Sequence, residues 1–348
     1  MFNNGIVTSV TMNQSVSPSC KPSFILSTLL ADGAGKPTAV LLEWHALPPE
    51  TITMMLESEA FLQLSAQLPC LVLGSDAQLD DPDLEAALLA AKCERVPDSA
   101  IASFDAPLDG KLPPSVKWVR GEWYKAPPVK ASNAQAASRA LALQMVQLVL
   151  ADADTHEIEA LFRRDPALSY HLLRLVNSLG VGVGKKIASF SQAIVILGRQ
   201  QLRRWLNLML FSARDGDQRS AMLFAKVAVR ARTMELVAKS AGLDRSNQEL
   251  AFMTGMFSLL GILFGQPLED VLKPLAISET LRAGVLDHAG ELGTLLSLME
   301  AADAADTTAM NMHLATLQVA PDDYNLHLID AHTWMLNIVR DTAGSPHA

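Results

Sequence analysis

Hydrophobic residues follow two different periods along this chain, and the change between them falls near residue 128. Between residues 23 and 124, short apolar runs typical of strands alternate with helical patterns. Strands are expected at 24–30, 38–44, 70–74, 101–104 and 117–124, and helices at 49–68 and 81–96. This alternation predicts a small α/β domain with some parallel strand pairing.

The pattern changes at APPVKASNAQ (126–135), whose prolines and small polar residues mark a domain edge. Beyond it strand signals nearly vanish, and Gly198 and Gly242 fit the glycine that follows a helix end. Three residue pairs have capping-box spacing: Asp154 with Glu157, Ser189 with Gln192, and Ser246 with Glu249. The chain is therefore expected to be a two-domain α+β protein, with an α/β domain at 1–128 and an all-α domain at 129–348.

The size of the first domain limits its architecture. A complete TIM barrel needs at least ~200 residues, more than this half of the chain offers. A different small sheet or a cut-down barrel is expected instead.

Composition and charge narrow the function class. Hydrophobic residues make up 49% and aromatics 5%, which favours a helix-rich globular protein, and the net charge of −9 disfavours general nucleic-acid binding. The charge is uneven, with ten basic and four acidic residues at 199–245 against three basic and twelve acidic at 269–341. This polarity is expected to reflect two solvated helix faces, and the alternatives are a partner surface or internal packing. The candidate partner-binding residues are Arg199, Arg203, Arg204, Arg230 and Arg232.

Targeting and metal signals are weak. A secretory signal begins with basic residues, and none precedes Lys21 here. The apolar run 255–265 is too short to span a bilayer. The three cysteines lack CxxC spacing, which argues against a disulfide framework or a zinc site. A cytoplasmic protein without a cofactor or membrane contact is expected.

Two further motifs fall short of a site. In LGVGVGKK (179–186), Gly180 and Gly184 are separated by three residues, and Lys186 replaces the hydroxyl of a phosphate loop. His327 and Asp330 can share one helix face, but two groups do not make a metal site, and they and His332 are expected to be surface polar residues.

The stretch RRDPALSYHLLRLVNSLG is a well-marked short helix, with Asp165 suited to the N-cap and Pro166 to the first helical position. Together with SFSQAIVILGRQQLRRWLNLML, it resembles the HDOD domain, a bacterial signalling module related in fold to HD phosphohydrolases. The matching positions are Asp165, Pro166, Leu168, Ser169, Leu172, Leu173, Asn177, Ser178, Ala193, Ile194, Leu197 and Gly198.

The same resemblance extends to GMFSLLG at 255–261. Catalytic HD proteins read like GLLHDIG there, and their His-Asp pair binds metal. Aligned on Gly255, that pair falls on Ser258 and Leu259, which cannot replace imidazole and carboxylate. The resemblance implies that the domain keeps the fold of the HD phosphohydrolases but has lost their metal centre.

The first half has a likeness of its own. WVRGEWYKAPP (118–128) looks like the end of an EAL domain, and Glu43 in VLLEWHAL matches the EAL-type glutamate. EAL enzymes hydrolyse cyclic di-GMP with several carboxylates, an Asn and a Lys around two metals, most of which have no match here. The resemblance implies a truncated, degenerate EAL domain.

The two likenesses imply a non-enzymatic signalling protein whose HDOD domain is a protein-interaction platform in cyclic di-GMP or two-component signalling. The implied partners are response regulators, diguanylate cyclases or phosphodiesterases, and a second copy of the chain. Two alternatives stay open. One is a metal-dependent phosphohydrolase or cyclic di-GMP phosphodiesterase with unrecognised ligands, and the other is a nucleotide- or nucleic-acid-binding module that uses the basic stretch.

Overall fold

A computed structural model describes residues 23–127, apart from 77–79 and 109–111, and residues 218–343, apart from 276. Between 128 and 217 it describes only scattered positions from 143 to 204, and for 339–343 only the backbone. The expected domain boundary at residues 128 and 129 lies outside the described part and stays a prediction.

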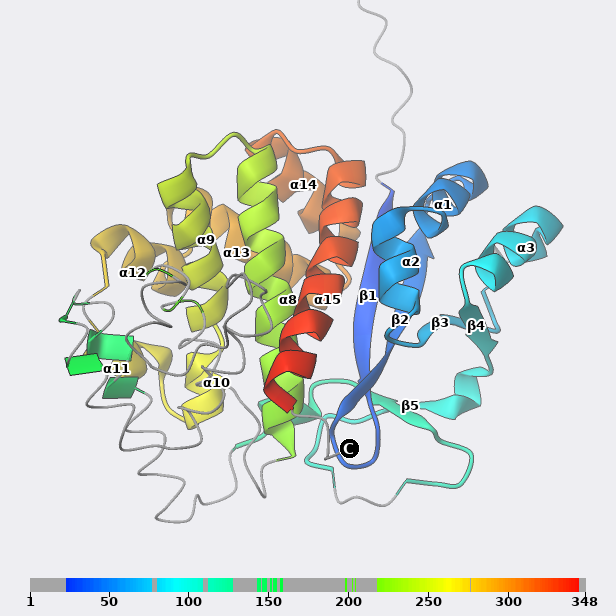
Figure 1. Ribbon diagram of the computed structural model, residues 1–348, viewed down its shortest axis with the longest axis horizontal. Helices are drawn as coiled ribbons and strands as arrows, with labels where there is room; N and C mark the ends of the chain where they lie inside the picture. Colours follow the sequence, from blue (N-terminus) through cyan, green and yellow to red (C-terminus); the bar gives the residue numbers. More distant parts are fainter. Residues whose placement is uncertain are drawn as a thin grey trace, which may run out of the picture.

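The first half forms one six-stranded sheet in the order β4-β3-β2-β1-β6-β5. β1 is antiparallel to both of its neighbours, and the other adjacent strands are parallel. The sheet curls like half of a barrel, with helices on its outer side (Figure 1). The strands are β1 (Phe24–Ala31), β2 (Pro37–His45), β3 (Cys70–Leu73), β4 (Cys93–Val96), β5 (Ile101–Ser103) and β6 (Trp118–Arg120).

A tight turn joins the two long strands. Asp32 Oδ1 accepts hydrogen bonds from the backbone amides of Ala34 and Lys36, at 3.0 and 2.9 Å. Gly35 takes the left-handed backbone that this turn requires, with φ of 81°. The turn fixes the register in which Leu26 faces Glu43 across the strand pair.

Two of the expected helices differ from the sequence pattern. The one expected at 49–68 is divided into α1 (Pro49–Leu56) and α2 (Glu59–Ser65), because Ser58 begins a new helix as its N-cap. The one expected at 81–96 ends early, as α3 (Pro82–Ala90), and its last residues form β4. Asp81 caps α3 through the amides of Asp83 and Leu84.

The described chain after residue 218 is helical throughout, in agreement with the expected all-α domain. None of the helices in the described ranges is both long and apolar enough to cross a membrane. The helices are α8 (Arg219–Ser240), α9 (Arg245–Phe257), α10 (Leu260–Phe264), α11 (Leu268–Leu272), α12 (Glu279–Leu286), α13 (Gly290–Asp303), α14 (Thr307–Leu317) and α15 (Pro321–Ala343).

Of the two helix signals predicted near residue 245, the glycine after α8 is confirmed and the N-cap of α9 is wrong. Gly242 follows α8 with a left-handed φ of 79°, as expected. The N-cap of α9 is Asp244, whose carboxylate accepts from the amide of Asn247 at 2.8 Å, and not Ser246. Asp244 competes successfully because its carboxylate is a strong acceptor for the free amides of a first turn.

The sheet and the helices share a core. α8 and α15 lie beside β1 (Figure 1), and one cluster of buried apolar side chains runs from β1 to α15. Asn325 of α15 is fully buried, accepts from the Ile25 amide at 2.9 Å and donates to the Ser23 carbonyl at 3.2 Å. These bonds tie the last helix to the first strand and fix where the bundle meets the sheet.

Candidate functional site: the cleft between sheet and helices

Parallel strands end together at one edge of the sheet, and there the helical bundle faces it. Glu43 of β2, Ser103 of β5 and Arg120 of β6 lie near the carboxyl ends of their strands. They line a cavity of about 190 Å³ whose opposite wall includes Lys226 of α8 and Asp303 of α13. Ligands of open α/β sheets bind at this edge. We call this cavity the sheet–helix cleft.

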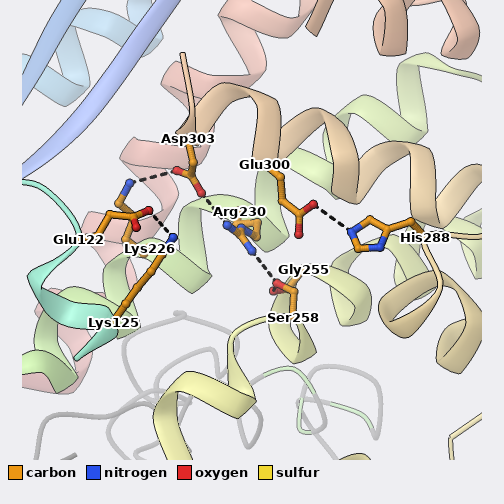
Figure 2. A network of polar contacts seen from close by, with 9 residues as sticks. All are labelled: Glu122, Lys125, Lys226, Arg230, Gly255, Ser258, His288, Glu300 and Asp303. Carbon is orange, nitrogen blue, oxygen red and sulfur yellow. Dashed lines mark hydrogen bonds and ion pairs between the residues drawn. The ribbon is translucent and has the colours of Figure 1, made fainter. Parts of the chain in front are cut away.

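The helical wall of the cleft is built around Asp303. Its Oδ1 lies 3.2 Å from Lys226 Nζ and its Oδ2 lies 2.5 Å from an Arg230 nitrogen. Arg230 also donates to Ser258 Oγ at 2.9 Å, and this chain of contacts is drawn in Figure 2. Burial opposes the charge on Asp303, but Lys226 and Arg230 outweigh it and hold the pKa of the carboxyl well below its usual range.

The sheet wall offers groups of both signs. The Nε of Arg120 donates to Ser103 Oγ at 3.0 Å, which orients the guanidinium along the cleft. Glu122 pairs with Lys125 (Figure 2). Glu43 is half-buried, and its side chain forms no hydrogen bond or ion pair within the described part of the chain. Its carboxylate can therefore accept a donor from a ligand.

A smaller cavity of about 40 Å³ lies next to the cleft, lined by Ser27, Lys226, Tyr324 and His332 among others. Ser27 Oγ and His332 Nε2 are 2.8 Å apart. His332 is 2% exposed, and this burial, with a smaller effect of Lys226, lowers its pKa to about 3. Such a ring stays neutral and is a weak base, so the pair stabilises the interface better than it activates a nucleophile.

The expectation that His332 is a surface residue is wrong, because α15 turns it inward onto β1. His327 is half-buried and its Nε2 lies 2.7 Å from Ser240 Oγ. The sequence could not distinguish these two histidines, since the helix face that packs on the sheet is set by Asn325 and its partners, which are distant in the chain.

The position that resembles a metal pair holds no ligand set. Ser258 Oγ accepts from Arg230 and donates to the Gly255 carbonyl at 2.8 Å, while Leu259 is 4% exposed. Among the described residues, no three His, Cys, Asp or Glu side chains converge as metal ligands would. The Ser258 hydroxyl already accepts a hydrogen bond from the Arg230 guanidinium, and Leu259 has no ligand atom. Ser258 and Leu259 therefore do not fit a divalent ion.

The arginines proposed for partner binding divide into two groups. Arg199 and Arg203 lie outside the described residues. Arg204, Arg230 and Arg232 pair within the chain: Arg204 with Glu235 at 2.6 Å and with Glu249, Arg230 with Asp303, and Arg232 with Glu235 at 2.7 Å. These contacts support the internal-packing alternative for those three arginines, and partner binding stays a prediction.

Of the positions that resemble the HDOD motif, only Gly198 is among the described residues. Its φ of 73° is left-handed, but the residue itself is helical, so its predicted place after a helix end is not confirmed. The others lie outside the described part: Asp165, Pro166, Leu168, Ser169, Leu172, Leu173, Asn177, Ser178, Ala193, Ile194 and Leu197.

Sequence reasoning missed two central residues of the cleft, Lys226 and Asp303. Lys226 had a visible signal, because it is a lone lysine in the apolar run MLFAKVAV. Asp303 had none, since one acidic residue at the end of a helix is ordinary. Their pairing depends on how α13 packs on α8, which periodicity does not show.

Comparison with known proteins identifies part of the chain. Residues 138–273 match the model of the HDOD domain. The chain therefore contains an HDOD domain, to which α8, α9, α10 and α11 belong by position. Lys226, Arg230 and Ser258 lie inside the matched segment, and Asp303 lies beyond it.

Two curated relatives were found. The protein named cyclic di-GMP phosphodiesterase CdgJ, from Vibrio cholerae serotype O1, is 29% identical over 222 residues, which is 64% of this chain and 51% of that protein. The uncharacterized protein YuxH of Bacillus subtilis is 28% identical over 139 residues, 39% of this chain and 34% of that protein. The chain thus spans about half the length of the first and a third of the second. No solved structure matches.

These matches correct one prediction. The expectation that the chain is not an enzyme is contradicted by its similarity to a protein named as a phosphodiesterase. That expectation relied on Ser258 and Leu259 in the helical domain and on the EAL-type ligands that have no match in the first half, whereas the similarity to CdgJ is longer than the HDOD match. Substitutions at one expected metal pair say nothing of groups elsewhere in the fold. The EAL-like interpretation of residues 1–128 stays a prediction.

Proposed function

We propose that this chain acts in cyclic di-GMP signalling and that it binds and hydrolyses cyclic di-GMP in the sheet–helix cleft. The observation that supports this most is the 29% identity to the relative named cyclic di-GMP phosphodiesterase. The fold supports this place, because the cleft lies at the carboxyl ends of parallel strands and brings together charged groups of both signs.

The ligand's chemistry suits the cleft. Cyclic di-GMP carries two phosphodiester anions and two guanine bases, whose Watson–Crick edges are rich in N–H donors. Arg120 and Lys226, on opposite walls, supply cations for a phosphodiester. Glu43 supplies an acceptor for N–H or water. The cavity, about 190 Å³, is smaller than the roughly 300–1,000 Å³ typical of ligand pockets, so one half of the dinucleotide enters it.

Hydrolysis adds one water across one P–O bond. The water oxygen bonds to phosphorus, the P–O3′ bond breaks, and O3′ takes up a proton from the solvent, which gives the linear dinucleotide. Glu43 accepts the proton of the attacking water, and Arg120 and Lys226 neutralise the charge that develops on the phosphoryl oxygens.

The test is product formation by the purified full chain. Cyclic di-GMP is incubated with the protein in a buffer containing Mg²⁺ or Mn²⁺, and the linear dinucleotide is measured by chromatography. Glu43→Gln should lower the rate at least tenfold, since an amide does not accept a proton from water. Glu94→Gln, an exposed residue of β4, is the matched control and should keep the rate. The proposal is overturned if the wild-type chain neither binds nor hydrolyses cyclic di-GMP.

A protein-binding role of the helical domain is a second candidate. The observation that favours it is the charge asymmetry, with ten basic against four acidic residues at 199–245. The expected partners are response regulators, diguanylate cyclases, phosphodiesterases or a second copy of the chain. Arg203→Glu should weaken such an association and reduce its salt dependence, whereas Arg245→Glu, at an exposed end of α9, should not.

A further inference from the structure

We infer that Lys226 is a ligand-responsive arm of the helical domain: it exchanges Asp303 for a phosphodiester oxygen when a nucleotide enters the sheet–helix cleft. The inference deepens the proposed function and rests on it. It assigns to the HDOD segment a direct part in binding at the edge of the sheet.

The first observation behind the inference is the position of Lys226. α8 packs against β1, β2 and the turn at Trp123–Lys125, so a side chain on this face of α8 points at the sheet. Lys226 lines both the cleft and the smaller cavity beside it, and its Nζ lies 5.8 Å from the Tyr124 ring centroid. Its side chain is 19% exposed, so the ammonium group can reach a ligand without leaving its place in the interface.

The second observation is that Asp303 has two cationic partners. Lys226 is held at 3.2 Å and Arg230 at 2.5 Å, on different carboxylate oxygens. When Lys226 turns to a ligand, Arg230 still compensates the charge of Asp303. A half-buried carboxylate with a single cation would lose its only partner in the same exchange, at a much larger cost. The doubled pairing therefore makes Lys226 the exchangeable partner and Arg230 the fixed one.

The charges around Lys226 decide the ligand class. Arg120 stands on the facing wall, and the negative groups nearby are Glu43, Glu122 and Asp303. Glu122 is paired with Lys125 and Asp303 with Arg230, which leaves Glu43 as the uncompensated acid. A ligand that suits this set has an anionic group for Arg120 and Lys226 and a donor edge for Glu43. A guanine nucleotide has both.

The exchange has a consequence for the bundle. Asp303 ends α13, Arg230 belongs to α8, and Arg230 also bonds Ser258 at the end of α9 (Figure 2). Without Lys226, the ion-pair partner that Asp303 of α13 keeps among the described residues is Arg230. Nucleotide binding thus removes a contact between α13 and α8, a pair that Arg230 also links to α9, and this is the differential interaction that a signal between two domains requires.

Isothermal titration of the full chain with cyclic di-GMP, at two salt concentrations, tests the inference. Lys226→Met should weaken binding at least tenfold and flatten its salt dependence, because one ionic contact is lost. Lys226→Arg should keep most of the affinity. Lys239→Met, an exposed lysine of the same helix, is the matched control and should change affinity less than twofold.

Asp303→Asn separates an exchange from a structural role. It removes the competitor of the ligand, so affinity should rise several-fold even though the melting temperature falls. A purely structural pair predicts weaker binding instead. If wild-type protein binds cyclic di-GMP and Lys226→Met binds it equally well, the inference fails and the proposed function stands. If wild-type protein does not bind, both fail.

Discussion

A few polar side chains inside the interface between sheet and helices determine how its stability depends on pH. His332, Asp303 and Lys226 lie within or beside the two cavities, and burial opposes the charged form of each, lowering the pKa of the two bases and raising that of the acid. Asp303 has cations to keep it charged, whereas His332 has only the Ser27 hydroxyl. Its Nδ1 is buried and has no hydrogen-bond partner in the described part of the chain. The ring is therefore kept neutral, and protonation opposes folding.

The free energy of unfolding should fall as the solution becomes more acidic. The folded pKa of His332 is about 3, below its ordinary value of 6.5, so the unfolded state binds the extra proton between these values. The loss approaches about 1.4 kcal/mol per pH unit below pH 6.5. Urea unfolding at pH 7, 6 and 5 measures it. His332→Gln should flatten this pH dependence and exposed His45→Gln should not; equal slopes in all three proteins would contradict the account.

At the scale of elements, close helix contacts depend on residues without side chains. A Cβ on Gly255 of α9 would lie 2.7 Å from the Cα of Ala231 in α8, and this neighbour is backbone, which cannot move alone. The absence of a side chain at Gly255 therefore lets α8 and α9, which both belong to the HDOD segment, pack in close contact.

Gly255→Ala should separate α8 from α9 at a cost of about 1–3 kcal/mol, the usual range for overpacking. Gly242→Ala provides the comparison. Nothing lies within 4 Å of its added Cβ, and it should cost stability only through its left-handed φ of 79°. Hydrogen exchange along α8 and α9 distinguishes them: it should quicken in the first variant only. Unchanged exchange and melting temperature in Gly255→Ala would show that the contact is loose.

Element type was largely predictable from the sequence, and element ends were not. Both long strands and the helical second half follow from periodicity and composition. β4 was assigned to a helix because the pattern of α3 continues past Ala90, and the chain reverses at Lys92, where no glycine marks the left-handed φ of 60°. Of the residues that line the cleft, only Glu43 was singled out, since the pairing of groups from β2, α8 and α13 depends on tertiary packing.

In the described part of the molecule, the last helix packs on the first strand and joins the sheet to the bundle. Asn325 near the start of α15 binds the backbone of Ser23 and Ile25 at the start of β1, about 300 residues away in sequence. Thr333 of the same helix donates to the Ala60 carbonyl of α2 at 3.3 Å. The last helix thus holds the sheet against the bundle, and the cleft exists only while this contact lasts.

Asn325→Ala should lower the free energy of unfolding by about 2–3 kcal/mol, because it leaves the buried Ile25 amide without its acceptor. Leu326→Ala, at a position that is 43% exposed, should cost much less. Thermal unfolding of both variants beside the wild type gives the comparison. Equal melting temperatures for the two would mean that α15 is not what joins the halves.

Hydrogen exchange with and without cyclic di-GMP tests the central claim most directly, because it shows both whether the nucleotide binds and where. The account predicts slower exchange in β1, β2, the segment 118–126 and the first half of α8, which surround the cleft. Exposed α3, on the outer side of the sheet, should be unchanged. Protection confined to other segments, or none at saturating nucleotide, would contradict the placement of cyclic di-GMP between the sheet and the HDOD helices.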